Sequence, residues 1–203
     1  MALALPIMAQ NVFGYLLSIV CTIAIGRLGA SELAASSLAN SVYIVTGMSL
    51  VMGLSSAMEP LCGQAYGAKD YKTLGDVLQR ALLVCWVACV PVALLWSQST
   101  ALMVAVGQDP AIADMAGRYL SISMPCIFIA IATDCLKKYL QAQHIVSPGM
   151  YATAAGTLMA PVFFYSLVYT LDLGLDGAAI AFVLCQMTAM SGLLGYTVSS
   201  GSE

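Results

Sequence analysis

The stretch LANSVYIVTGMSLVMGLSSAMEPLCGQAYGAKDYKTLGDVLQRA, residues 38–81, decides the fold class. No charged residue occurs from Leu38 to Met58, and most side chains in that run are apolar. A helix that crosses a bilayer needs about 20 such residues, because every backbone N–H and C=O must be paired within the segment. The run therefore predicts a transmembrane helix, and we expect the EPLCGQAYGAKDY segment after it to be a loop.

The composition of the whole chain agrees with a membrane protein. Of 203 residues, 61% are hydrophobic and 8% are charged, with a mean hydropathy of +0.90. An ordinary soluble domain is about a quarter charged. The net charge is only −3 and the seven Lys and Arg residues form no basic stripe, so nucleic acid is not an expected partner.

Six apolar windows are long enough to span a membrane, which predicts an all-α membrane protein without a soluble domain. They cover about residues 3–26, 33–57, 76–97, 113–135, 148–171 and 177–198. Asp109-Pro110 and Ser147-Pro148 are typical helix starts, in which a capping side chain precedes proline. Four prolines inside spans favour kinks: Pro6, Pro91, Pro125 and Pro161. The first span lacks the basic start of a secretory signal, so we expect a retained helix in a chain that is part of a longer protein.

The basic residues predict the orientation of the spans. Five lie beside the loops after the second and fourth windows, at positions 69, 72, 80, 137 and 138, whereas Arg27 and Arg118 lie on the other side. The positive-inside rule places the first group in the cytoplasm. Both ends of the six-span unit then face the cytoplasm as well.

The segment after the second window has some features of a nucleotide-binding loop. A P-loop requires G-x-x-x-x-G-K-[ST] between a strand and a helix. Here Gly63 and Gly67 are four residues apart, Lys69 follows two residues after Gly67, and Asp70 stands where Ser or Thr is needed. A nucleotide site is excluded by this spacing.

The same segment, together with its flanks, resembles the multidrug and toxic compound extrusion (MATE) family, in particular its plant DETOXIFICATION branch. The core CGQAYGA, residues 62–68, is highly specific to that family. Similar stretches are GRLGASELAASSLA at 26–39, LKKYLQAQHIVSP at 136–148 and LGLDGAAIA at 173–181, so the resemblance covers nearly the whole chain. It implies one six-helix lobe of a two-lobe transporter that exchanges small organic substrates for protons or sodium ions. The second six-helix lobe and membrane lipid would be its partners.

Polar side chains inside the first two windows are candidates for the substrate cavity. Gln10, Asn11, Asn40 and Tyr43 would be costly in contact with lipid, so we expect them to face protein or a wet cavity. Hydrogen bonding between helices without any ligand is the alternative role. Within the motif we expect Gly63, Gln64 and Gly67 to be structural, with the two glycines allowing a sharp turn or a close helix approach.

Two acidic residues are candidates for ion pairs. Glu59 lies at the inner end of the second window, where it could form a gating ion pair with a basic neighbour such as Lys69. The alternative is an interfacial acid that is hydrated or held by helix ends. Asp134 precedes Lys137 and Lys138 by about one helical turn, which favours a local ion pair.

No nucleophile, base and orienting partner share a spacing that would indicate an enzyme, and no cofactor or metal site is expected. The prediction is therefore a cation-coupled exporter in the plasma or vacuolar membrane. Two alternatives remain open: a lipid-linked flippase of the same superfamily, which should have a more basic cavity, and a non-transporting partial chain or scaffold subunit.

Overall fold

In the computed structural model the backbone is described for residues 4–200 and the side chains to residue 197. The first half contains α1 (Ala4–Gly26), α2 (Ala30–Val42), the π-helical segment η1 (Tyr43–Met48), α3 (Ser49–Ser56), α4 (Met58–Gly67) and α5 (Tyr71–Ser97). The second half contains α6 (Ser99–Ala105), α7 (Pro110–Ile122), α8 (Met124–Ala142), α9 (Ser147–Phe164), the π-helical segment η2 (Tyr165–Thr170) and α10 (Gly174–Ser200). The described part of the chain contains no strand, which confirms the all-α prediction.

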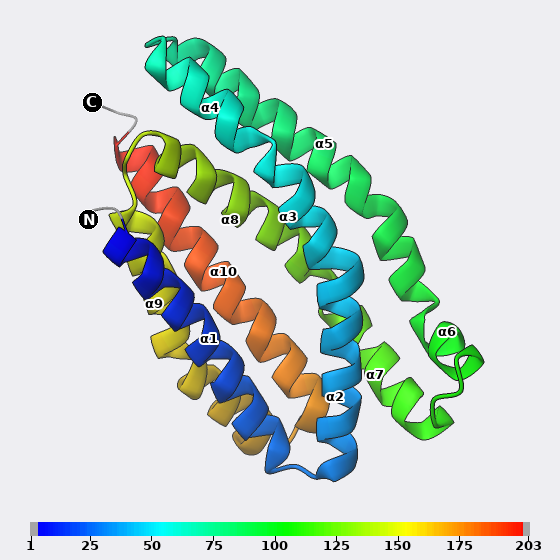
Figure 1. Cartoon of the computed structure of the whole chain (residues 1–203). Helices are drawn as coiled ribbons and strands as arrows, with labels where there is room; N and C mark the ends of the chain where they lie inside the picture. The colour runs from blue at the N-terminus through cyan, green and yellow to red at the C-terminus, as the bar shows by residue number, and fades with distance from the viewer. Residues whose placement is uncertain (1–3, 201–203) are drawn as a thin grey trace.

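The helices form an elongated bundle in which five segments can each cross a membrane by length and hydropathy. A sixth span forms if α7 and α8, which meet at a 46° bend, are counted as one broken helix. In Figure 1, α1, α9 and α10 pack together on one side, and α2 to α5 form the other, with α8 between them. The chain is an integral, multi-pass membrane protein.

The second span is longer than the hydropathy pattern predicts. It runs without a loop from Ala30 to Gly67, so the expectation of a loop at Glu59–Gly67 was wrong, and only residues 68–70 connect it to α5. Cys62 and Leu74 are buried as α4 packs against α5 and α8. Because packing against neighbours stabilises a helix beyond its apolar part, low hydropathy did not mark its end.

Other helix ends also extend past the apolar windows. α5 begins at Tyr71 rather than residue 76, and α8 continues to Ala142 rather than residue 135. Asp109 caps α7, because its carboxylate accepts a hydrogen bond from the Ala111 amide at 2.8 Å. Ser147 does not cap α9: Val146 occupies that position without a side-chain hydrogen bond.

The prolines differ in their effects. Pro125 lies in the first turn of α8, beside the 46° bend, and Pro161 precedes the π-helical segment η2. Pro91 lies within α5, which remains helical over all its 27 residues. The bend beside Pro125 agrees with the expected kink, and the lost hydrogen bond at Pro91 does not break α5, since a membrane helix can absorb such a loss.

The middle of the bundle is held by a close contact at η1. Trp96 is fully buried, and its indole N–H donates to the Thr46 hydroxyl at 2.8 Å. A Cβ on Gly47 would lie 2.7 Å from the Trp96 ring and 2.9 Å from the Ile127 side chain. Glycine at this position therefore lets the second span approach α5 and α8 closely.

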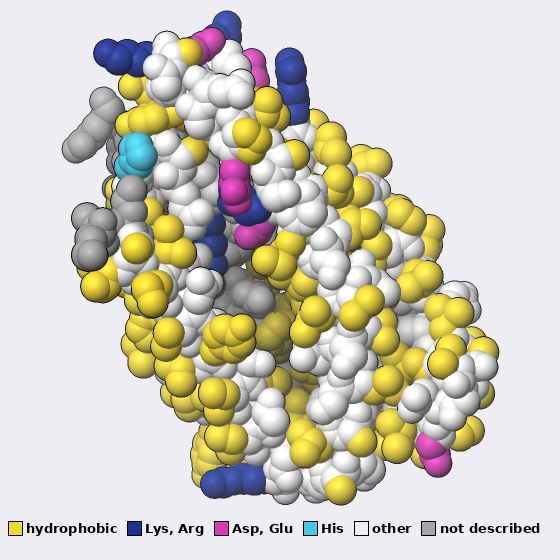
Figure 2. All heavy atoms as spheres, in the orientation of Figure 1, with side chains coloured by type: hydrophobic (Ala, Val, Ile, Leu, Met, Phe, Trp, Pro, Cys, Tyr) yellow, Lys and Arg dark blue, Asp and Glu magenta, His cyan; other side chains and the backbone are white. Residues whose placement is uncertain are grey.

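The surface in Figure 2 is mostly hydrophobic, with charged side chains gathered where α4 and α5 meet. It is hollowed between the α1 side of the bundle and the α2–α3 side. Only Ala24 and Ile25 of α1 are buried. A helix with so little burial inside its own bundle has faces that lipid or another protein segment must cover.

Candidate functional site

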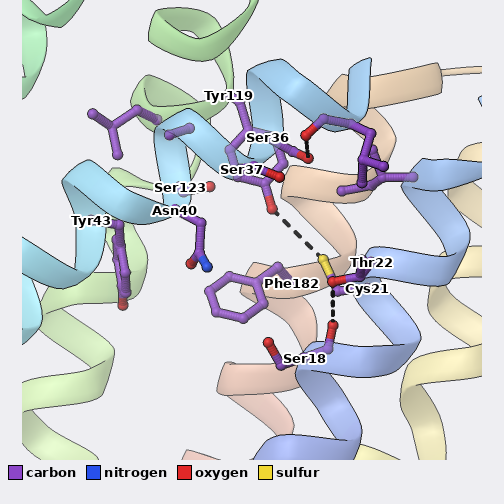
Figure 3. Close-up of a pocket in the computed structure, with 14 residues that line it drawn as sticks. Ser18, Cys21, Thr22, Ser36, Ser37, Asn40, Tyr43, Tyr119, Ser123 and Phe182 are labelled. Atoms are coloured by element: carbon purple, nitrogen blue, oxygen red, sulfur yellow. Dashed lines mark hydrogen bonds between the residues drawn. The ribbon is translucent and has the colours of Figure 1, made fainter. Parts of the chain in front are cut away.

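A small polar cavity lies between α1, α2, α7 and α10 (Figure 3). Its volume is about 80 Å³. Polar side chains line it from three helices: Ser18, Cys21 and Thr22 of α1, Ser36, Ser37 and Asn40 of α2, and Tyr119 of α7. Tyr43 and Phe182 add aromatic surface, and Ser123 stands at the break between α7 and α8.

Two hydroxyl groups of the cavity are held by local hydrogen bonds. Thr22 donates to the Ser18 carbonyl at 2.9 Å, and Ser36 donates to the Leu33 carbonyl at 3.0 Å. Such bonds back to the preceding turn satisfy a hydroxyl without fixing a ligand. The Cys21 sulfur and the Tyr119 hydroxyl lie 3.9 Å apart and join α1 to α7.

Two buried hydroxyl groups of the cavity have no hydrogen-bond partner among the described residues. The Tyr43 side chain is buried with its ring 5.3 Å from that of Trp96 and 6.2 Å from that of Phe182. The Ser123 hydroxyl is buried as well. Because an unpaired buried hydroxyl is costly, each group has unused hydrogen-bonding capacity at the wall of the cavity.

The chemistry of the cavity is that of neutral hydrogen bonding and aromatic contact. None of its lining residues is charged. Ligand pockets for small molecules have volumes of about 300–1,000 Å³, so about 80 Å³ holds a few water molecules or one functional group of a larger compound. The exposed side chains of Ser18, Thr22, Ser37 and Asn40 continue the polar surface outward.

The four predicted cavity residues do not form one site. Asn40 and Tyr43 line the cavity, whereas Gln10 lies against Gly149 and Lys137 with its carbonyl oxygen buried and unpaired. Asn11 is exposed on α1. The serine and threonine residues of the cavity were missed, although the four-residue spacing of Ser18 and Thr22 places them on one helix face.

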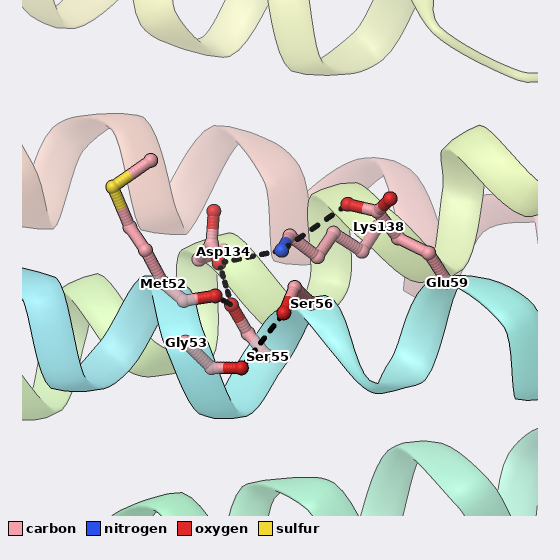
Figure 4. Close-up of polar contacts among 7 residues, drawn as sticks. All are labelled: Met52, Gly53, Ser55, Ser56, Glu59, Asp134 and Lys138. Atoms are coloured by element: carbon pink, nitrogen blue, oxygen red, sulfur yellow. Dashed lines mark hydrogen bonds and ion pairs between the residues drawn. The ribbon is translucent and has the colours of Figure 1, made fainter.

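A second polar cluster joins α3, α4 and α8 (Figure 4). The Lys138 ammonium lies 3.3 Å from Glu59 Oε1 and 3.7 Å from Asp134 Oδ2. The Ser55 hydroxyl donates to the same Asp134 oxygen at 2.5 Å. One lysine therefore connects an acid of the second span to an acid of its own helix.

The partner suggested for Glu59 was wrong. Lys69 is exposed at the end of α4, where it takes a left-handed backbone conformation with φ of 58°. Helical spacing relates Lys138 to Asp134, but no sequence spacing relates residues 59 and 138. Tertiary packing of α4 against α8 brings them together.

The motif glycines do not have the roles expected of them. Gly63 and Gly67 are helical, and a Cβ at either would meet nothing within 4 Å, so no neighbouring helix approaches them closely. The turn after α4 is made by Lys69 instead. Both glycines and Tyr66 line an open groove that reaches His144, and Gln64 is exposed on the same helix.

Apolar spans packed around a small polar cavity define a multi-pass helical membrane protein. The chain belongs to the MATE family, since the MatE family model matches residues 6–166. This assignment agrees with the resemblance of the CGQAYGA segment.

Relatives from Arabidopsis thaliana place the chain near the DETOXIFICATION proteins. It is 38% identical to Protein DETOXIFICATION 16 over 176 residues, which cover 87% of this chain and 36% of that protein. It is 37% identical to Protein DETOXIFICATION 51 over 199 residues, or 98% of this chain and 37% of the relative. The chain thus spans little more than a third of the relatives that it matches.

Solved structures show the same architecture. The crystal structure of the eukaryotic MATE transporter AtDTX14 superposes with a TM-score of 0.92 and 32% identity, covering 97% of this chain and 44% of that one. An outward-facing multidrug resistance MATE transporter superposes with a TM-score of 0.85 over 94% of this chain and 42% of its own, at 21% identity. The second likeness concerns the fold alone. The bundle corresponds to one lobe of these longer proteins.

Proposed function

We propose that this chain supplies one of two six-helix lobes of an exporter that moves organic solutes in exchange for protons or sodium ions. Membership of the MATE family supports this proposal, as does the match to less than half of each relative. In transporters built from repeats, substrate sites lie near the bilayer midplane at the interface between the repeats. The exposed polar residues beside the cavity are suited to such an interface.

The observation that carries the proposal is the pair of unpartnered hydroxyl groups, Tyr43 and Ser123, in an uncharged cavity. Polar groups in a membrane segment are expensive unless they serve packing or a ligand. The cavity alone is too small for a drug-sized compound. A second lobe facing it would complete the substrate site.

The nature of the cavity wall favours organic solutes over lipid-linked cargo. A flippase for an anionic headgroup needs cationic side chains at its site, and the lining of this cavity contains no Lys or Arg. Hydroxyl, amide and aromatic groups instead suit neutral or weakly polar aromatic compounds. We place the exporter in the plasma or vacuolar membrane.

Expression in a drug-sensitive host tests the proposal. The chain would be produced alone and with the second half of Protein DETOXIFICATION 16, and ethidium efflux would be measured at equal membrane abundance. We expect efflux only from the combination. Efflux by the isolated chain, with crosslinking that shows a monomer, would refute the two-lobe proposal. Efflux by crosslinked homodimers would instead mean that two copies of this lobe take the place of two different lobes.

A matched pair of variants on α2 tests the cavity itself. Ser37 lines the cavity, whereas Ser41 lies one turn further and only donates to the Ser37 carbonyl. In the active combination, Ser37→Ala should change the KM for ethidium and Ser41→Ala should not. Equal effects of the two variants would show that the cavity is not part of the substrate path.

A further inference from the structure

A second groove lies on the outside of the bundle, between α1 and the α9–η2 segment. Its volume is about 250 Å³. Val20 and Ile23 form one wall, Pro161 and Tyr165 form the other, and Arg27 and Tyr169 stand at its end. The groove lies toward the end of the bundle where α1 joins α2, away from the Lys69 turn.

The groove faces away from the polar cavity. Successive residues of an α-helix are about 100° apart around the axis, so Val20, Ile23 and Arg27 lie roughly opposite to the cavity residues Cys21 and Thr22. The two faces also differ in chemistry, since the groove face of α1 is apolar up to Arg27. An apolar face of a membrane helix that points away from the polar cavity is suited to contact with lipid acyl chains.

Local backbone structure shapes the groove. Pro161 and the π-helical segment η2 make the end of α9 irregular beside α1. The Tyr169 hydroxyl donates to the Ala24 carbonyl at 2.8 Å and so connects η2 to α1. The rings of Tyr165 and Tyr169 lie 5.9 Å apart, and tyrosines are frequent where the hydrocarbon region meets water.

Arg27 is the charged residue of this groove. It directly follows the span Ala4–Gly26, which places it at the boundary of the hydrocarbon region, where lipid phosphates lie. It is exposed and makes no ion pair with any described residue. The planar guanidinium group of arginine binds phosphate oxygens through paired hydrogen bonds.

We propose that this groove binds a phospholipid of the adjacent leaflet, with the phosphate at Arg27 and an acyl chain along the wall formed by Val20, Ile23 and Pro161. The positive charge of Arg27 and its position at the boundary of the hydrocarbon region favour a phosphate headgroup. The apolar walls of the groove favour an acyl chain. Free phosphate satisfies only the first of these contacts. The site is separate from the solute cavity, so it does not depend on the proposed export function.

Native mass spectrometry of the purified chain tests this site. After nanodisc reconstitution with phosphatidylglycerol and release into mild detergent, the wild type should retain one phospholipid. Arg27→Gln should lower its occupancy about tenfold, because a charge-assisted hydrogen-bonded contact is lost. Arg80→Gln is the matched control, since Arg80 is an exposed arginine outside the groove.

A second pair of variants tests the acyl-chain contact. Ile23→Trp fills the groove, whereas Ile19→Trp places the same bulk on an exposed part of α1 outside it. Only Ile23→Trp should lower lipid retention, and a phospholipid with a diazirine in its acyl chain should crosslink to residues 20–27 or 161–169. Equal retention in Arg27→Gln and Arg80→Gln, or displacement of the lipid by inorganic phosphate alone, would overturn the proposal. So would crosslinks spread evenly over the exposed helices.

Discussion

The Lys138 ammonium lies 3.3 Å from Glu59 Oε1 and 3.7 Å from Asp134 Oδ2, so a single cation links the C-terminal part of the second span to α8. The lysine side chain is 13% exposed, whereas that of Glu59 is 62% exposed. A charge with little solvent access depends on its partners more than an exposed one does. Lys138 is therefore the sensitive member of this cluster.

We predict that Lys138→Gln destabilises the chain more than Glu59→Gln does. The lysine substitution leaves Asp134 without its cation, whereas an exposed ion pair contributes only about 0.2–1 kcal/mol. Thermal unfolding in detergent would measure both variants and the double variant. Lys69→Gln is the control. A larger coupling free energy between Glu59 and Lys69 than between Glu59 and Lys138 would contradict the structure.

In the assembled transporter, we predict that Glu59→Gln slows efflux at unchanged membrane abundance if the ion pair has to break and reform during the cycle. A charge-assisted contact would be lost in one of the two states. Efflux should be measured against Gln64→Ala, an exposed substitution on the same helix. An unaltered rate would leave Glu59 as an interfacial acid.

Gly47→Ala should destabilise the bundle by about 1–3 kcal/mol, the usual cost of overpacking a filled core. The added methyl group would lie 2.7 Å from the Trp96 ring. The control is Gly53→Ala, because a Cβ there meets nothing within 4 Å and alanine favours a helix. Chemical unfolding of both variants checks this, and equal stability would contradict the close contact at η1.

The first turn of α5 should respond to pH through Asp70. Hydrogen bonds from the Thr73 hydroxyl and amide lower the pKa of this carboxyl group below its usual value of 3.8. The stabilisation is therefore complete above about pH 4 and is lost as the pH falls through the lowered pKa. The protection of the Thr73 amide from hydrogen exchange, relative to its intrinsic rate at each pH, should fall in that acidic range. In Asp70→Ala this protection should be low at every pH, and protection equal to that of the wild type would show that the cap is not formed.

The orientation can be tested with introduced cysteines. In a background without the seven native cysteines, Lys72→Cys should resist an impermeant thiol reagent in intact cells, and Asp172→Cys should react. The reason is the excess of basic residues near the first position, which favours the cytoplasm. Equal labelling rates would refute this orientation.

The hydropathy pattern and the CGQAYGA motif were sufficient to predict the class of protein. The uncharged run from Leu38 to Met58 is compatible only with a buried or membrane helix, and CGQAYGA narrowed the class to one family. The Asp109-Pro110 pair also marked the start of α7 correctly, because capping is a local interaction between neighbours in the chain.

Tertiary structure decided which distant residues meet. Glu59 and Lys138, or Cys21 and Tyr119, are far apart in the chain, and their contacts depend on the rotation and depth of each helix in the bundle. Helix packing also explains why α4 continues past the apolar run and ends at Gly67. Its contacts with α5 and α8 stabilise helical turns that hydropathy does not predict. The sequence alone thus determined a multi-pass, all-α membrane protein of the MATE family. The polar cavity and the Lys138 cluster arise only when the helices pack, because a side chain's partners are set by the geometry of neighbouring helices.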